Sequence, residues 1–191
     1  MDIKIMRMTA LNEEMRKDVA RVLVLAFSHN LSFLSKDIEV LASAFFPWLD
    51  PETVYVALMG NKVVGLVGMS TNKNRVITVT KKECRKAFGF FKGSIGYYFL
   101  NKEFNKLIEY DNNTVYIQCV ATHPDYHHQG VAKKIFEYIF ENHKYHFILE
   151  VTDTNSKAIS LYNKIGFKES KRIKEKHPRI TGFNYRIYME R

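Results

Sequence analysis

The feature that most constrains the fold is a strand, a glycine-containing turn, a helix and a second strand in succession over residues 114–152. TVYIQCVA (114–121) is rich in β-formers, and FILEVT (147–152) is almost continuously apolar, as expected of a strand in a sheet covered on both faces. The helix between them carries an apolar stripe formed by Val131, Ile135, Phe136, Ile139 and Phe140. This order predicts a βαβ crossover, and therefore two parallel strands side by side.

The rest of the chain predicts further elements in an α/β (α+β) order, without a repeat, a low-complexity tract or a linker. Strands are expected at 3–8, in a hairpin over 54–70 and at 184–191, with a further candidate at 75–80. Helices are expected at 12–27, after Ser35 as an N-cap, from Thr80 to Ala87, at 88–107 with a break near Gly93, and at 155–164 before Gly166. We therefore expect a single domain over residues 1–191.

Composition narrows the functional classes. Hydrophobic residues make up 46% of the chain and charged residues 26%, which is ordinary for a globular protein. The apolar runs are too short to cross a bilayer, and the N-terminal residues show no secretory signal. Cys84 and Cys119 are too few for a disulfide framework or a zinc site of their own. We expect a cytoplasmic protein without membrane contact.

The formal net charge of +9 raises the alternative of a nucleic-acid-binding protein. The basic residues are spread widely, with clusters at 81–86 and 171–179, and such clusters are usually solvated surface. The chain has no nucleic-acid recognition motif, so we expect no nucleic-acid partner. Steeply salt-dependent DNA binding would be needed to revive this alternative.

The turn before the helix has the character of an anion site. The first N–H groups of a helix have no partner within it and carry the positive end of the helix dipole. Gly130 lets a phosphate approach the main chain, and Ala132 is too small to fill that space. His127, His128 and Gln129 can add hydrogen-bond donors around the rim. A glycine near a helix start is also common without any ligand, so spacing alone does not establish the site.

Other ligand motifs fit this segment less well. His123 precedes a proline turn with no acidic or thiolate ligand beside it, so we expect no metal. The segment is neither the GxxxxGK[ST] phosphate loop nor the dinucleotide GxGxxG pattern.

Two linked motifs carry a resemblance to the GNAT superfamily of N-acetyltransferases. VATHPDYHHQGVAKKIFEYI resembles the family's acyl-CoA-binding segment, [QR]-x-x-G-x-[GA] leading into a helix. LEVTDTNSKAISLYNKIGF (149–167) is similar to the family's second element through Asn155, Ala158, Leu161, Tyr162, Gly166 and Phe167. The resemblance is strong over 114–191 and weak over 1–70. It implies a mixed, mostly antiparallel twisted sheet flanked by helices, with a helical insert at about 71–113.

The resemblance implies acetyl-CoA as the co-substrate. By analogy with the family, backbone groups of Val120, Ala121 and Thr122 would bond the pantetheine arm, and Asn155 would lie near it. The pyrophosphate would lie on the main-chain N–H groups of His127, His128, Gln129, Gly130, Val131 and Ala132. His127 stands where the family usually has Arg or Gln, but binding through the main chain should survive this departure.

The implied reaction is direct transfer of the acetyl group to a primary amine. Tyr162 matches the tyrosine that often protonates the leaving thiolate in the family, although its spacing also fits a core position beside Leu161. The general base is open, because Gln118 occupies a position where relatives often have Glu. Glu109, Asp111 or ordered water are the remaining candidates.

The acceptor is not identified by the sequence. We expect a small-molecule or peptide amine, and a homodimer is compatible with the chain. The aromatic residues of the N-terminal helices usually flank the acceptor in this fold but are more often core than pocket; they are Phe27, Phe33, Phe45, Phe46 and Trp48. The alternative function is a non-catalytic acyl-CoA-binding regulatory module.

Overall fold

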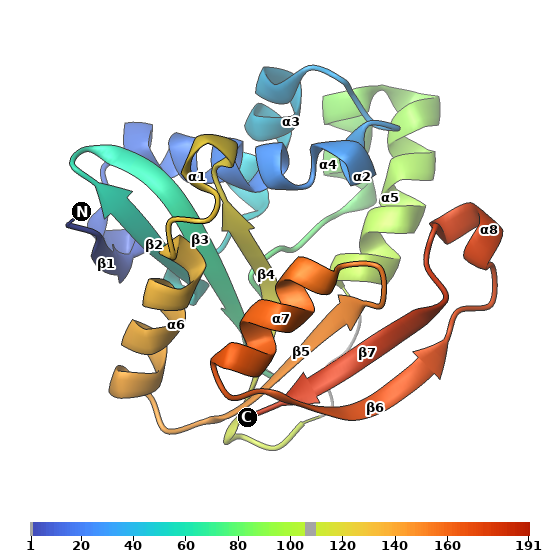
Figure 1. Cartoon of the computed structure of the whole chain (residues 1–191). Helices are drawn as coiled ribbons and strands as arrows, with labels where there is room; N and C mark the ends of the chain where they lie inside the picture. Colours follow the sequence, from blue (N-terminus) through green and yellow to red (C-terminus); the bar gives the residue numbers. More distant parts are fainter. Residues whose placement is uncertain (1, 106–109) are drawn as a thin grey trace.

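A seven-stranded sheet forms the centre of the computed structural model, which describes residues 2–105 and 110–191 (Figure 1). Its spatial order is β1-β2-β3-β4-β5-β7-β6, and every neighbouring pair is antiparallel except β4 and β5. The strands are β1 (Lys4–Arg7), β2 (Val54–Met59), β3 (Lys62–Ser70), β4 (Thr114–Thr122), β5 (His146–Thr152), β6 (Lys168–Lys174) and β7 (Tyr185–Glu190). The parallel β4–β5 pair confirms the crossover that residues 114–152 predict.

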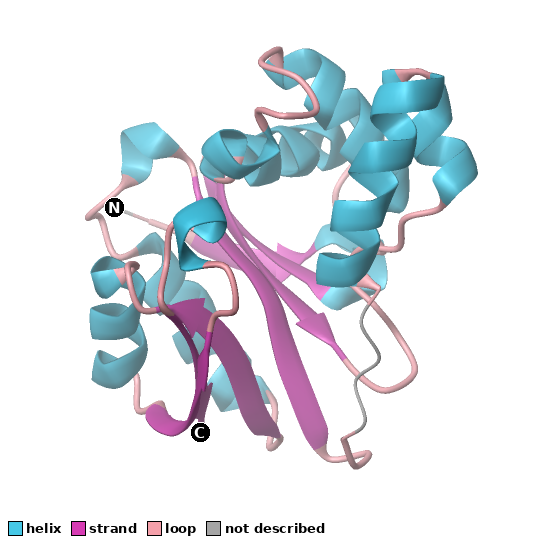
Figure 2. Ribbon diagram, turned by 90° about the vertical axis from the view of Figure 1, so that its right-hand side faces the viewer, coloured by secondary structure: helices cyan, strands magenta, loops and turns pink. Residues whose placement is uncertain are grey.

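Helices lie on both sides of this sheet (Figure 2). Those of the described residues are α1 (Glu13–Ala26), α2 (Ser28–Leu31), α3 (Ile38–Phe45), α4 (Lys81–Phe88), α5 (Phe90–Phe104), α6 (Val131–Asn142), α7 (Ser156–Lys164) and α8 (Pro178–Thr181). Short 3-10 turns lie at Met8–Ala10, Phe46–Trp48, Pro51–Thr53 and Pro124–Tyr126. The expected mixed, mostly antiparallel sheet with a helical insert is therefore confirmed.

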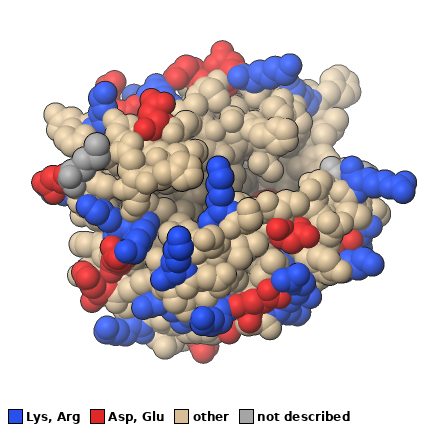
Figure 3. All heavy atoms as spheres, viewed as in Figure 1, with Lys and Arg blue, Asp and Glu red and all other residues tan. Residues whose placement is uncertain are grey.

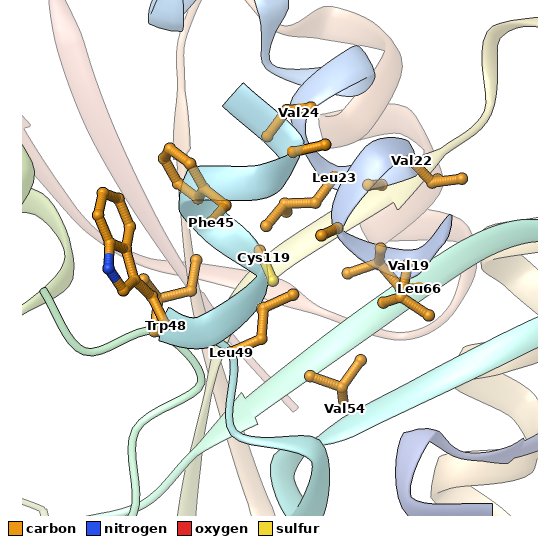
Figure 4. Packing of buried hydrophobic residues seen from close by; sticks show 14 of the residues in the cluster. Val19, Val22, Leu23, Val24, Phe45, Trp48, Leu49, Val54, Leu66 and Cys119 are labelled. Carbon is orange, nitrogen blue, oxygen red and sulfur yellow. The ribbon is translucent and has the colours of Figure 1, made fainter. Parts of the chain in front are cut away.

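The first core lies between α1, α3 and one face of β2, β3 and β4 (Figure 4). Val19 and Leu23 of α1 meet Leu66 of β3, and Phe45 packs beside Trp48 with ring centroids 4.9 Å apart. Among the five N-terminal aromatic residues, these two are buried, Phe27 and Phe46 are half-buried, and only Phe33 is exposed. The general expectation that aromatic residues belong to the core therefore holds for most of them.

The second core lies on the opposite face, under α6 and α7. The predicted stripe of α6 is buried at Val131, Ile135, Phe136 and Ile139, and Phe140 packs partly buried against it. Gly166 follows α7 with φ +98°, the left-handed conformation that a helix end requires and that glycine adopts without steric cost.

A β-bulge divides β4 into two parts. Ile117 pairs with Met69 and Cys119 pairs with Gly68, so Gln118 is an extra residue without a partner of its own on β3. Because side chains alternate along a strand, the extra residue switches their faces. Ile117 belongs to the second core, whereas Cys119 belongs to the first.

β4 and β5 separate immediately after this bulge. Their pairing ends at Ile117 and Leu149, although the strands continue to Thr122 and Thr152. Figure 1 shows the two strands diverging from that point. The C-terminal half of β4 therefore pairs with β3 on one side and has no paired strand on the other, where the gap between β4 and β5 begins.

One expected helix cap is confirmed, whereas a second expected cap and a candidate strand are not. Thr80 caps α4 as predicted, accepting from the Glu83 N–H at 3.2 Å. The expected N-cap at Ser35 is wrong: the Asp37 carboxylate accepts from the first turn of α3 instead. The candidate strand at 75–80 is wrong too, because it forms only one isolated bridge, between Leu49 and Ile77.

The expected helix break near Gly93 is also wrong. α5 is continuous from Phe90 to Phe104, and the break lies at Gly89, whose φ is +81°. Gly93 is instead a packing residue, because a Cβ there would lie 2.3 Å from the Cys84 carbonyl oxygen. The glycine lets α4 and α5 approach closely and does not end the helix.

The strand β6 was not predicted. Every residue of Lys168–Lys174 is exposed, so hydrophobic alternation is missing and the basic segment reads as a surface loop. β6 nevertheless pairs with β7 along its length and forms the edge of the sheet. Charged side chains on an edge strand discourage pairing with other chains.

Candidate functional site

The loop between β4 and α6 presents a row of main-chain N–H groups. His128 and Gly130 adopt left-handed conformations, with φ of 63° and 75°. Left-handed residues in a turn can bring successive N–H groups to one side, as in anion-binding nests. Within the described part of the chain, no side chain caps α6 and the N–H groups of residues 128–133 donate no hydrogen bond. The expected anion site therefore has unengaged main-chain donors at residues 128–132, whereas the expected donor at His127 is wrong, because its N–H donates to the Pro124 carbonyl oxygen at 3.2 Å.

The side chains of this loop brace it. His127 donates from Nε2 to the Thr122 carbonyl oxygen at 3.1 Å, and Gln129 donates from Nε2 to the Asp125 carbonyl oxygen at 3.1 Å. These two side chains therefore hold the loop against its own backbone and do not supply free donors at the rim. His127, which stands where the family resemblance expects Arg or Gln, therefore braces the turn.

The start of α6 is held close to the sheet. A Cβ at Gly65 of β3 would lie 2.6 Å from Cγ1 of Val131, the first residue of α6. Glycine at this position lets the N-terminus of α6 sit directly on the strand. Ala132 follows, half-buried, and the first turn contains no acidic residue. The field of the helix dipole is therefore not compensated by the first turn itself.

The edge of β4 that faces the gap can be assigned from its pairing with β3. The His123 N–H donates to the Val64 carbonyl oxygen at 2.9 Å. Opposite residues in an antiparallel pair alternate between bonded and non-bonded pairs. Ala121 is therefore bonded to β3, while the main-chain groups of Val120 and Thr122 point into the gap. Of the three residues expected to bond a pantetheine arm, this geometry favours Val120 and Thr122 and disfavours Ala121.

Tyr162 lies on α7 and is only 7% exposed. Its ring packs on Phe136 and Phe167, with centroids 6.1 and 5.9 Å away. The pKa of Tyr162 is raised, first by burial and second by the neighbouring Cys119 of β4. A raised pKa keeps the phenol protonated through the physiological range, so the group can donate a proton and is a poor base. The structure shows no hydrogen bond from its hydroxyl to another described residue.

Asn155 joins β5 to α7. Its Oδ1 accepts from the Ala158 N–H at 3.2 Å, which makes it the N-cap of α7. The asparagine of the second motif therefore has a structural role that is independent of any ligand. It also fixes the start of the helix that carries Tyr162.

The comparisons with known proteins agree with this geometry. The family model described as acetyltransferase (GNAT) family matches residues 23–167. The chain belongs to the acetyltransferase (GNAT) family. None of the curated proteins matches the chain.

Solved GNAT structures share the fold at low sequence identity. An N-acetyltransferase from Staphylococcus aureus Mu50 is 17% identical with a TM-score of 0.63, over 98% of this chain and 100% of that chain. A GNAT acetyltransferase from Bacillus cereus ATCC 10987 is 9% identical with a TM-score of 0.60, over 100% and 97%. The ribosomal-protein-S18-alanine N-acetyltransferase from Escherichia coli is 14% identical with a TM-score of 0.57, over 99% and 92%. At these identities, the likeness concerns the fold alone.

In this GNAT chain, Gln118 is fully engaged as a structural residue. Its Oε1 accepts from the Ser70 hydroxyl at 2.5 Å and from the Val76 N–H at 3.1 Å. Its Nε2 donates to the Phe104 carbonyl oxygen at 3.1 Å. The bulge residue therefore ties the sheet to both ends of the insert. An amide held in this way cannot act as a general base.

The other two candidate bases gain no support. Asp111 lies in the turn before β4, where its Oδ1 accepts from the Asn113 N–H at 3.0 Å and the Thr114 hydroxyl at 2.7 Å. Glu109 lies outside the described residues.

A polar cluster beside the gap was not predicted. Glu150 is the first residue of β5 beyond its pairing with β4, and its carboxylate forms an ion pair with Arg186 of β7. The Tyr188 hydroxyl also bonds to Glu150, and burial together with this carboxylate raises the pKa of Tyr188. Burial raises the pKa of Tyr116 on β4 still more, with Glu150 as the second cause. The signal was present in the sequence, because Glu150 is the charged residue of an otherwise apolar strand.

The insert reaches this cluster from α5. Glu103 lies 3.7 Å from Arg186, and Glu175 lies 3.6 Å from it on the other side.

The molecule is hollowed on this side, between its upper helical layer and the half that carries α7 (Figure 3). A second hollow of about 380 Å³ opens further along the same sheet face, lined by Ile148 and Tyr188 among others.

Residues 2–105 and 110–191 contain no helix long and apolar enough to span a membrane. They also contain no group of three or more His, Cys, Asp or Glu side chains placed to hold a metal ion.

Proposed function

We propose that this chain transfers an acetyl group from acetyl-CoA to a primary amine of a small-molecule or peptide acceptor. The observation that carries the proposal is the free row of N–H groups at residues 128–133, next to the open edge of β4. A pyrophosphate suits the first feature, since it needs several donors and a positive field. An amide-containing arm such as pantetheine suits the second, since it can pair with an unpaired strand edge.

The cofactor would run from the α6 loop into the gap. Its arm would bond the main chain of Val120 and the N–H of Thr122, whose carbonyl oxygen is already bonded by His127, and pass Asn155 at the start of α7. The thioester would then reach the bulge of β4, with Tyr162 of α7 on the side of the second core. In this arrangement the bulge turns the strand at the point where the reacting carbon must be exposed to the acceptor.

The chemical step would be direct. The amine nitrogen attacks the thioester carbonyl carbon, the carbon–sulfur bond breaks, and Tyr162 gives its proton to the leaving thiolate. The acylated nitrogen releases its proton to solvent, which leaves the neutral amide, and the phenolate takes a proton back from solvent. An acyl-cysteine intermediate on Cys119 is disfavoured, because burial raises the pKa of this thiol to about 12 and a thiol is a weak nucleophile.

The acceptor would approach from the face that carries Tyr116 and Glu150. The Glu150 carboxylate can attract an ammonium group, and once the amine has lost a proton to water it can attack. Its ion pair with Arg186 would hold the carboxylate in position. This assigns Glu150, and not Gln118, as the acidic group on the acceptor side.

A calorimetric titration with acetyl-CoA tests the proposal. Gly130 has φ +75° and open space around it, so most larger residues would strain the loop. Asn and Asp tolerate this conformation and have nearly the same shape, so Gly130→Asn and Gly130→Asp differ mainly in charge. We expect the Asp variant to bind acetyl-CoA more than about tenfold more weakly than the Asn variant, because its carboxylate repels the pyrophosphate.

The stability of the two variants should follow the opposite order. A carboxylate at a helix N-terminus is favourable, so Gly130→Asp should unfold at a temperature no lower than Gly130→Asn. Equal acetyl-CoA affinities would contradict a phosphate site at this loop. Saturable binding by the unmodified chain would then be followed by release of free thiol in the presence of amines.

A non-catalytic acyl-CoA-binding module is the second candidate. The engagement of Gln118 favours it, since this strand position offers no base. Tight acetyl-CoA binding with no thiol release from any primary amine would support the module over the enzyme.

A further inference from the structure

The insert exposes a continuous apolar surface on α5. Five large side chains are largely accessible: Phe91 82%, Tyr98 67%, Phe90 61%, Ile95 59% and Phe99 53%. Phe33, in the turn that follows α2, extends the patch, with its ring 5.6 Å from that of Phe99. Scattered exposed apolar residues are ordinary, but a patch of this size on a single helix is unusual for a protein surface that faces water only.

The packing of α5 explains why these residues point outward. A Cβ at Gly93 would lie 2.3 Å from the Cys84 carbonyl oxygen, and one at Gly96 would lie 2.4 Å from the Leu34 side chain. Close approach on that side requires glycine at these two positions, and Tyr97, Leu100 and Phe104 complete the inner face of α5 against the first core. The five exposed residues lie on the outer face, and no described element covers them.

The same insert is strongly basic. Residues 81–104 contain six Lys or Arg and two Glu, a formal net charge of +4. The Arg85 guanidinium lies over the Phe90 ring at 4.2 Å and donates to the Ser94 hydroxyl at 2.8 Å, which fixes a cation beside the aromatic tip. Lys92 follows Phe91 directly and is exposed. In Figure 3, Lys and Arg border the uncharged surface at the upper right, where Figure 1 places α4 and α5.

We propose that the α4–α5 insert is a docking surface for an anionic lipid bilayer. Aromatic residues that enter the headgroup region and cations that meet anionic lipids are the two components of interfacial membrane binding. The surface needs no spanning helix, so it is compatible with the absence of one among the described residues. This proposal revises the expectation of no membrane contact, which was based on the absence of an apolar segment long enough to cross a bilayer. It does not depend on the proposed acetyl transfer.

Charge and shape favour a bilayer over a second copy of the chain. Two copies meeting through this face would bring two surfaces of +4 together, and like charges across an interface are unfavourable. Phe90 and Phe91 lie at the turn between two helices and project from it. A projecting tip suits a deformable lipid surface, whereas a protein partner would need a matching cavity.

Docking would also orient the rest of the molecule. Glu103 near the C-terminal end of α5 reaches Arg186 beside the gap between β4 and β5. The insert therefore connects the proposed membrane surface directly to the proposed acceptor side.

Vesicle co-sedimentation of the full chain, without acetyl-CoA, tests the proposal. Vesicles of phosphatidylcholine are compared with vesicles of equal parts phosphatidylcholine and phosphatidylglycerol. We expect partition into the anionic vesicles alone, decreasing as salt is added. Phe91→Ser and Lys92→Glu should each lower the partition coefficient by about tenfold, the first through lost apolar burial and the second through lost charge attraction.

Matched controls lie elsewhere on the surface. Ile173→Ser on β6 removes an exposed apolar residue, and Lys62→Glu at the β2–β3 turn reverses an exposed charge. Both should partition like the unmodified chain. Thermal unfolding of all four variants checks that each one folds.

Three outcomes would overturn the proposal. One is a folded chain that does not bind anionic vesicles. Another is binding that the insert variants and the controls reduce equally. The third is a dimer in solution that Phe91→Ser dissociates, without vesicle binding, which would assign the surface to a second copy.

Discussion

The segment from β4 to α7 and the α4–α5 insert use apolar residues in opposite ways. In the first, α6 buries Ile135 and Phe136 against the sheet. In the second, α5 buries Gly93 and Gly96 and leaves Phe91 exposed. This difference shows that the face with which a helix packs depends on how closely the neighbouring helix or strand approaches it. Where the backbones of α4 and α5 nearly touch, at Gly93, only glycine fits the contact, and five large residues of α5 remain exposed on the other face.

This difference divides the proposed functions as well. The β4–α7 segment holds main-chain groups in fixed positions, which suits a site that must bind a cofactor in one orientation. The insert presents side chains to the surroundings, which suits an adaptable surface. The following predictions test whether each region has the role assigned to it.

The largest effect is expected at Tyr162, in the β4–α7 segment. Tyr162→Phe removes the proton donor and should lower the turnover number by roughly a hundredfold or more, with acetyl-CoA affinity nearly unchanged. The fold should be little affected, because the hydroxyl makes no hydrogen bond to the described residues. Thiol release and calorimetric titration measure the two quantities.

The exposed Tyr138 of α6 offers a matched control for this change. Tyr138→Phe should leave turnover unchanged. If Tyr162→Phe also left turnover unchanged, Tyr162 would be a core residue without a role in proton transfer. The β4–α7 segment and the α4–α5 insert would then not differ in the way proposed.

The second prediction tests the glycine face of the insert. Gly93→Ala should lower the free energy of unfolding by about 1–3 kcal/mol, because the added methyl group meets a backbone carbonyl that cannot move aside. Gly96→Ala should be close to neutral, because its methyl group meets the end of the Leu34 side chain, which can rotate. Urea unfolding of both variants measures the difference. A stabilising Gly93→Ala would mean that α4 and α5 do not approach so closely.

Sequence reasoning succeeded where large residues form the interior. The βαβ crossover, the buried stripe of α6, the cap at Thr80 and the left-handed Gly166 all follow from patterns a few residues long. It failed where the deciding contact is distant in sequence or where no periodicity exists. Gly93 appeared to be a helix breaker because its neighbour, Cys84, is visible only in the fold. β6 appeared to be a loop because an exposed edge strand has no apolar alternation.

The site shows the same division. The anion loop was predictable, because its groups belong to the main chain and its geometry follows from local turn residues. Gln118 was not, because its partners Ser70, Val76 and Phe104 come from three separate parts of the chain. The cluster at Glu150 was missed for the same reason, since its meaning depends on Arg186 of a different strand.

A third prediction concerns the boundary between the two regions. Glu150→Gln keeps the shape but removes the charge that is proposed to attract the acceptor. We expect about a tenfold loss in kcat/KM for the amine, with acetyl-CoA affinity unchanged. Initial rates at varied amine concentration measure it.

Glu175→Gln is the matched control, because Glu175 also partners Arg186 but lies farther from the end of the β4–β5 pairing. It should change kcat/KM little. Equal losses in the two variants would mean that Arg186 needs carboxylates for structural reasons and that Glu150 has no particular role toward the acceptor.

The smallest effect is expected at His143, the C-cap of α6, whose Nε2 lies 2.5 Å from the Tyr55 hydroxyl oxygen. A helix C-terminus favours a charged histidine, yet burial and then Arg7 lower the pKa of His143 below its usual 6.5. The unfolded chain therefore binds a proton before the folded chain does as the pH falls through about 6.5. Stability should then decrease toward low pH, by about 0.5 kcal/mol or less after solvent screening.

Urea unfolding at about pH 7.5 and about pH 5.5 can isolate this contribution by comparison with His143→Gln, which is neutral at both values. The variant should lose less stability on acidification than the unmodified chain. A steeper loss in His143→Gln would mean that the helix dipole outweighs burial. The C-terminal end of α6 would then be exposed to solvent, as the outer face of α5 is. The contrast between a buried α6 and an exposed α5 would hold only for the first turns of α6.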